Sequence, residues 1–184
     1  QKCAACLDLE CKLMQCIQKS NLISSRKKRT ELFFTLSHHP TSSASSTGPT
    51  SSKNAQGSEL LGNLIFYNII ILETVKAPLQ QASSVSGEAE HIATRCLNFL
   101  TVSLDIFKEE LIRLRAEVYK SGEKCRVLDF LRGPYLAQLI QSSLLFSQHR
   151  SKTLAAASLA TLGAVIKCSF GNLLDSASLA SQGG

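Results

Sequence analysis

A segment rich in serine and threonine divides this chain and limits what it can fold into. Nine of the twelve residues from 41 to 52 are Ser or Thr, and Gly48 and Pro49 lie among them. Such a segment buries too little apolar surface to offset the entropy lost when it becomes ordered. We therefore predict a disordered linker between two helical parts. The four expected parts are residues 1–36 with amphipathic helices and a basic cluster, a linker at 37–57, a helical domain at 58–176 and a flexible tail at 177–184.

The part before the linker has apolar residues at the spacing of an α-helix. We expect a helix over residues 2–21 that buries one stripe of side chains. The residues of that expected stripe are Cys6, Leu9, Leu13, Cys16 and Ile17. A second, short helix is predicted over residues 29–36, where three apolar residues can form one face.

The part after the linker is predicted to be helical throughout. Ser58 is expected to cap the first of these helices and Pro78 to end it. Gly133 and Pro134 mark a boundary between two further helices, and Ser151 is expected to cap the next. The predicted helices cover residues 58–76, 86–118 in one piece or in two joined near 103–105, 123–131, 134–147, a segment from 151, and 170–179. Apolar residues rarely alternate and no Asn-Gly or Asp-Gly turn occurs, so the sequence predicts an all-α protein.

Two segments of the second part echo each other. Residues 93–100 (ATRCLNFL) and 155–162 (AAASLATL) share the order Ala, two residues, a small residue, Leu, two residues, Leu. This pattern resembles the inner helices of armadillo and HEAT-type repeats, where small residues and leucines stack successive units. The resemblance covers residues 60–174 and implies a fragment of an α-solenoid made of stacked antiparallel helices. The small residues at 155–157 and 163–164 would let neighbouring backbones approach closely.

The short connections in this part fit a second arrangement equally well. A closed helical bundle also joins antiparallel helices by turns as short as those expected at residues 133–134 and 148–151. The alternative to the solenoid is therefore a closed bundle, including a secreted signalling protein of the cytokine type.

A basic cluster precedes the linker and is the sharpest motif of the chain. Its residues are Arg26, Lys27, Lys28 and Arg29, within a chain whose formal net charge is +6. Four consecutive positive charges in an exposed, flexible setting are typical of a nuclear import signal that an import receptor binds. The competing interpretation is a solvated charge run without a partner. Nucleic-acid binding through this cluster is a weaker alternative, because no aromatic residues interleave with the basic ones.

The cysteines indicate a reducing compartment. Their number is odd, seven, and four of them crowd into the first sixteen residues: Cys3, Cys6, Cys11 and Cys16. A secreted disulfide framework normally uses an even set. On one helix these four side chains would point in different directions, so we predict free thiols, no metal site and no cofactor. The expected localisation is the nucleus or the cytoplasm, with the nucleus favoured.

Neither catalysis nor a membrane span is expected. The chain contains no nucleophile elbow, phosphate-binding loop or dinucleotide fingerprint. The most apolar stretch, residues 60–75, is interrupted by Asn63, Asn68 and Glu73 and is shorter than a membrane span requires.

These observations favour a non-enzymatic scaffold for protein–protein interactions. We expect it to bind other proteins through its helical surface within a larger nuclear or cytoplasmic complex, for which an association with chromosomes is one setting. Because the chain begins with Gln1 and ends without an obvious stop signal, we also expect a piece of a longer repeat protein.

Overall fold

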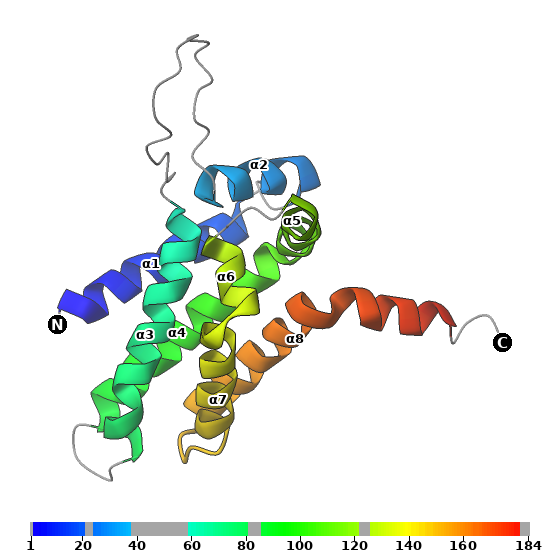
Figure 1. Ribbon diagram of the computed structural model, residues 1–184. Coiled ribbons are helices and arrows are strands. Elements are labelled where there is room, and N and C mark those ends of the chain that lie inside the picture. Colours follow the sequence, from blue (N-terminus) through cyan, green and yellow to red (C-terminus); the bar gives the residue numbers. More distant parts are fainter. Residues whose placement is uncertain (1, 21–23, 38–58, 81–85, 122–125, 181–184) are drawn as a thin grey trace, which may run out of the picture.

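The computed structural model describes residues 2–20, 24–37, 59–80, 86–121 and 126–180 (Figure 1). Within these ranges the chain forms α-helices and their connections and no β-strand, which confirms the predicted all-α class. The helices are α1 (Lys2–Lys19), α2 (Arg26–Ser37), α3 (Leu60–Gln80), α4 (Ser86–Ile106), α5 (Lys108–Ser121), α6 (Arg126–Arg132), α7 (Pro134–Ser147) and α8 (Lys152–Ala180).

Two antiparallel helix pairs stack on each other to form the centre of the fold. Helices α3 and α4 make the first pair, helices α7 and α8 the second, and α7 contacts α3 while α8 contacts α4 (Figure 1). Helix α1 packs against α4 as well. The same contacts describe two stacked hairpins and a ring of four helices, so they fit both arrangements expected from the sequence.

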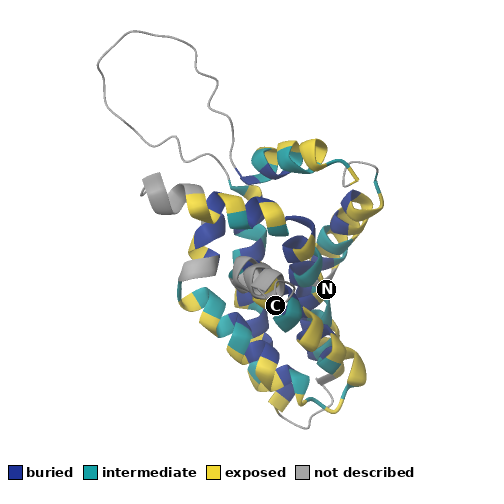
Figure 2. Cartoon of the chain, turned by 90° about the vertical axis from the view of Figure 1, so that its right-hand side faces the viewer, coloured by how far each residue is buried: buried dark blue, intermediate teal, exposed yellow. Residues whose placement is uncertain are grey.

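The core lies where these helices face one another. Figure 2 shows the buried residues on the inner sides of the helices and the exposed residues on their outer sides. The chain has no Trp, and its core consists mainly of Phe and aliphatic side chains, with Met14, Cys96 and Cys168 among them. The largest fully buried side chains include Phe33, Phe99, Phe107, Phe146, Leu61, Ile65, Leu72, Leu97 and Leu104.

Small side chains bring α8 close to α4. Ala157, Thr161, Ala164 and Cys168 recur at helical spacing and are all buried. The Oγ1 atom of Thr161 lies 3.2 Å from the carbonyl oxygen of Leu97, so a side chain of one helix reaches the backbone of the other. This close approach agrees with the expectation drawn from the small residues of α8.

Several predicted helix boundaries are confirmed. Pro134 occupies the first turn of α7, with Gly133 as the extended residue before it. At the start of α8 the backbone amide of Leu154 donates a hydrogen bond to the Ser151 hydroxyl over 3.4 Å, so Ser151 caps this helix. Ser58, Gly122 and residues 123–125 lie outside the described residues.

Other boundaries differ from the prediction. Pro78 does not end α3, which continues to Gln80; a proline in the last turn removes only one backbone donor there. Helices α4 and α5 are separate and meet at Phe107, slightly beyond the expected joint, while backbone hydrogen bonds continue on both sides of that residue. Ser37, expected in the linker, is a buried residue of α2. The piece expected at residues 170–179 is part of one continuous helix that extends into the expected tail.

The predicted buried stripe of α1 is wrong except for Ile17. Leu9 and Leu13 are 70% and 46% exposed, and Cys6 and Cys16 are exposed as well. The buried side of α1 is formed instead by Leu7, Met14 and Ile17. Two polar contacts accompany this orientation: the Asp8 carboxylate pairs with Arg95 of α4, and the Asn68 side-chain amide of α3 donates to the Glu10 carboxylate over 2.8 Å. Helix α1 therefore has two apolar sides, of which the fold uses one.

Helix α3 is long and apolar enough to cross a membrane by length and composition, and among the described helices no other meets that criterion. Leu61, Ile65 and Leu72 of this helix are at most 1% exposed, because they pack into the core. A core helix of a soluble protein meets the same criterion, so the absence of a membrane span stays a prediction.

Candidate interaction surfaces

The basic cluster lies in the first turn of α2 and not in the flexible setting expected from the sequence. Arg26, Lys27 and Lys28 are exposed. Arg29 is different, because its guanidinium group donates to the Glu109 carboxylate over 2.6 Å and to the Glu110 carboxylate over 3.2 Å. The structure therefore divides the cluster into three exposed charges and one arginine held by α5.

Electrostatics explain why two glutamates meet this arginine. Positive side chains at the N-terminus of a helix are unfavourable beside the positive end of its dipole, and negative side chains are favourable. Helix α2 begins with basic residues, whereas Glu109 and Glu110 lie in the first turn of α5. The Thr30 hydroxyl also donates to the Glu110 carboxylate over 3.2 Å. The two carboxylates thus stabilise the beginning of both helices.

Aromatic contacts hold α2 on the rest of the fold. Phe33 is fully buried, and its ring centroid lies 5.5 Å from that of Phe107 at the junction of α4 and α5. At the next residue, Phe34, the ring makes a cation–π contact: its centroid lies 5.0 Å from the Cζ atom of the Arg113 guanidinium. Helix α2 is thereby fixed to the α4–α5 junction, and its exposed charges occupy a defined place on the surface.

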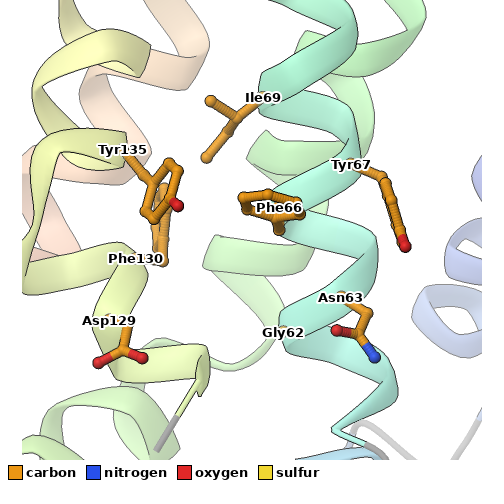
Figure 3. Close-up of a pocket in the computed structure, with 8 residues that line it drawn as sticks. All are labelled: Gly62, Asn63, Phe66, Tyr67, Ile69, Asp129, Phe130 and Tyr135. Atoms are coloured by element: carbon orange, nitrogen blue, oxygen red, sulfur yellow. The ribbon is translucent and has the colours of Figure 1, made fainter.

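A cavity lies between α3, α6 and α7 (Figure 3). Its volume is about 310 Å³, and its lining includes Gly62, Phe66, Ile69, Asp129, Phe130 and Tyr135. Helix α6 is held beside α3 by the Glu59 carboxylate, which accepts a hydrogen bond from the Val127 backbone amide over 3.0 Å. This bond satisfies an amide at the beginning of α6 that has no partner within the helix.

The cavity is aromatic and carries one carboxylate. Figure 3 shows Phe66 and Tyr135 facing each other, and their ring centroids are 5.1 Å apart in an edge-to-face contact. Tyr67 extends from the other side of α3, away from this pair. Asp129 is exposed and supplies the negative charge. Such a lining is suited to accept an apolar side chain of a partner protein, or a Lys or Arg side chain whose positive end meets the carboxylate.

Five cysteines whose side chains the structure describes range from exposed to buried. Cys6 and Cys16 are exposed on α1, whereas Cys96 and Cys168 are buried. The Cys168 thiol donates to the Leu104 carbonyl over 3.4 Å, and burial raises its pKa to about 12. Cys11 is half-buried, and burial raises the pKa of its thiol too. In the part of the chain that the structure describes, no three His, Cys, Asp or Glu residues are grouped to hold a metal ion.

This division predicts the order in which the thiols react. At pH 8, Cys6 and Cys16 should react first with a disulfide reagent such as dithionitrobenzoate, because they are open to solvent. Cys168 should react only on unfolding, since the thiolate is the nucleophile and little of it forms below a pKa of about 12. Mass spectrometry of the labelled peptides over time measures this order. Labelling of Cys168 as early as Cys6 would contradict the packing of α8 on α4.

Large apolar side chains remain exposed on several helices. Leu9 on α1, Tyr67 on α3 and Leu144 on α7 are 70%, 58% and 52% exposed. On α8, Leu159 and Ile166 are 59% and 49% exposed and lie seven residues apart, two turns along the same side. These residues are available to partners without any change in the fold.

Comparisons with protein-family models, curated proteins and solved structures find no match for this chain. The class of protein that the described residues define is an all-α fold with stacked helix pairs and exposed apolar sides.

Sequence reasoning located the basic cluster but missed how it is used. Nothing in the local sequence distinguishes Arg29 from the other residues of the basic cluster. Its partners, Glu109 and Glu110, follow eighty residues later. The cavity was also missed, because its aromatic residues come from separate helices. The adjacent residues Glu109 and Glu110 were the one signal that could have suggested a partner for a positive charge, but the expected helix joint near residues 103–105 did not place them in a first turn.

Proposed function

We propose that this chain is a non-enzymatic scaffold for protein–protein interactions, part of a larger nuclear or cytoplasmic complex. The observation that carries this proposal is the set of large apolar side chains that stay exposed on α1, α7 and α8 while other apolar side chains form a buried core. Exposed apolar side chains that lie next to one another, such as Leu144 with Leu145 on α7 and Leu159 with Ile166 along one side of α8, are candidate contacts for partners.

The architecture supports the same function. Stacked helix pairs resemble the units of an α-solenoid, which present extended binding faces without reactive groups. The contacts between the pairs α3–α4 and α7–α8 agree with such stacking, as they do with a ring of four helices. An α-solenoid fragment is therefore the finer fold that we propose.

A capture experiment with three matched variants tests the scaffold function. The intact chain and the pairs Leu9→Gln/Leu13→Gln, Leu144→Gln/Leu145→Gln and Leu159→Gln/Ile166→Gln are immobilised and incubated with nuclear and cytoplasmic extracts. All six leucine and isoleucine side chains are exposed, so the variants should fold normally. We expect the intact chain to retain a defined set of proteins that at least one variant loses. Identical captured sets for all four proteins would contradict the proposal.

The exposed part of the basic cluster supports a nuclear address. We expect Arg26→Ala/Lys27→Ala/Lys28→Ala to reduce nuclear accumulation of a fluorescent fusion towards that of the fluorescent protein alone, because an import receptor would bind these three exposed charges. Quantitative imaging of the nuclear-to-cytoplasmic ratio measures the effect. An unchanged ratio would remove the import role and leave a solvated charge run.

A closed helical bundle with a signalling role is the second candidate. It is favoured by the contact between α3 and α7, which completes a ring of four helices. A count of free thiols in denaturant without reductant separates the two candidates. Seven free thiols agree with the intracellular scaffold, whereas intramolecular disulfides would favour a secreted bundle.

A further inference from the structure

The stacking of α8 on α4 follows a constant register. The Thr161 hydroxyl and the Cys168 thiol of α8 donate hydrogen bonds to the carbonyl oxygens of Leu97 and Leu104 of α4, over 3.2 Å and 3.4 Å. In both bonds the two partners are 64 residues apart in the sequence. The Thr101 and Thr161 hydroxyl oxygens are 2.9 Å apart. The two helices therefore run in the same direction, and α4 offers one side, formed by Leu97, Thr101 and Leu104, to the small residues of α8.

The sequence echo relates this side of α4 to a side of α8. When residues 93–100 are aligned with 155–162, Leu97 corresponds to Leu159. Extending the alignment pairs Thr101 with Gly163 and Leu104 with Ile166. We call Leu159, Gly163 and Ile166 the α8 stripe. It is the counterpart of the side of α4 that α8 covers.

The two counterparts differ in how far other helices cover them. Leu97 and Leu104 are completely buried, whereas Leu159 and Ile166 are 59% and 49% exposed. A Cβ atom added at Gly163 would meet nothing within 4 Å. The α8 stripe therefore has the composition of a stacking surface, but no described part of the chain covers it.

Gly163 gives independent evidence for a close approach from outside. Apart from proline, glycine is the least favourable residue in a helix interior. Gly163 lies in the middle of the 29-residue helix α8. Since the fold leaves the space beside it open, the described packing gives no reason for a missing side chain there. A helix that packs against the α8 stripe would use that space.

We infer that the α8 stripe is a docking surface for an α-helix of another protein. A helix on the α8 stripe would continue the stacking of α4 and α8 by one more helix, so it should present small residues such as Ala, Ser or Thr at the spacing of Ala157, Thr161 and Ala164. Lys152 is exposed seven residues before Leu159, on the same side of α8, whereas Lys167 pairs with Asp105 of α4 over 3.9 Å. An acidic residue of the docking helix should therefore lie near Lys152. This inference rests on the proposed scaffold function and names its surface and the chemistry of its partner.

A designed helical peptide tests the inference on the intact chain. The peptide copies residues 152–169, held helical by a staple on its far side. Lys152→Glu supplies the acidic residue, Leu159→Gln and Ile166→Gln remove its own stripe, and Cys168→Ala prevents oxidation. A control peptide also carries Ala157→Leu and Thr161→Leu, which fill the small side. Fluorescence anisotropy measures binding of the labelled peptides.

We expect saturable binding of the first peptide and none of the control peptide. On the chain, Gly163→Leu should weaken binding by about tenfold or more, because the added side chain occupies the open space. Its melting temperature should not fall, since the same space is empty in the folded chain. Leu60→Gln, a change at a similarly exposed leucine on α3, should leave binding unchanged.

Three results would overturn the inference. They are absence of saturable binding, equal binding by the Gly163→Leu chain, and self-association of the intact chain that Gly163→Leu abolishes, which would assign the stripe to a second copy. The scaffold function would survive each of them if the capture experiment lost its proteins through the α1 or α7 variant. Failure of the inference and failure of the proposed function are therefore distinguishable.

Discussion

Replacing Phe33 with alanine should lower the free energy of unfolding by about 3–5 kcal/mol, the usual cost of deleting a buried aromatic side chain. Phe33 has no exposed surface and packs on Phe107 where α4 and α5 meet. The substitution would leave a cavity that α2 cannot fill without moving away from the junction. Chemical denaturation monitored by circular dichroism measures the change.

The neighbouring phenylalanine provides the control. Phe34 is half-buried and contacts Arg113 through a cation–π interaction, so Phe34→Ala removes less buried surface. Its cost should be clearly smaller than that of Phe33→Ala. Equal losses for the two variants, or a loss below about 1 kcal/mol for Phe33→Ala, would contradict the placement of α2.

Replacing Arg29 with alanine should cost about 1–3 kcal/mol, because it leaves the Glu110 carboxylate buried without its positive partner. The Glu110 side chain is 2% exposed and receives the Arg29 guanidinium over 3.2 Å. Arg29→Lys should restore only part of the loss, since an ammonium group lacks the planar fork that reaches both Glu109 and Glu110. Thermal and chemical denaturation of the three proteins give these differences.

Lys28 is the matched control for this prediction. It belongs to the same basic cluster and is exposed, so Lys28→Ala should change stability by less than about 0.5 kcal/mol. If Lys28→Ala and Arg29→Ala had the same effect, the division of the cluster into exposed and structural charges would be wrong.

Local signals predicted much of the fold correctly. Gly133 and Pro134 separate α6 from α7 as expected, because the proline ring fits the first turn of a helix and lacks only a donor that has no partner there. Ser151 caps α8 for a similar local reason. Such boundaries depend on backbone chemistry within a few residues, so the sequence alone is sufficient to place them.

The orientation of α1 could not be predicted from its own residues. Both the side with Leu9 and Leu13 and the side with Leu7 and Met14 have helical spacing. The structure buries the second, and the polar residues beside it meet Arg95 of α4 and Asn68 of α3. Contacts between distant segments decide between two local patterns of similar strength.

The candidate surfaces were predictable to different degrees. The sequence echo marked Leu159 as equivalent to Leu97, and the small residues of α8 suggested a close helix contact. Which of the two leucines is buried depends on the order in which the helices stack. No local sequence pattern predicts that order. The role of Arg29 likewise depends on glutamates of another helix.

Helix α8 covers the side of α4 that contains Leu97 and leaves the corresponding side of its own surface, which contains Leu159, exposed. Methyl NMR of leucine-labelled protein with a soluble paramagnetic agent tests this arrangement directly, because relaxation enhancement reports exposure of each methyl group. We predict strong enhancement for Leu159, which is 59% exposed, and little for Leu97, which is completely buried. A protected Leu159 would show that another part of the chain covers the stripe, and an exposed Leu97 would show that α8 does not stack on α4; either result would contradict this account.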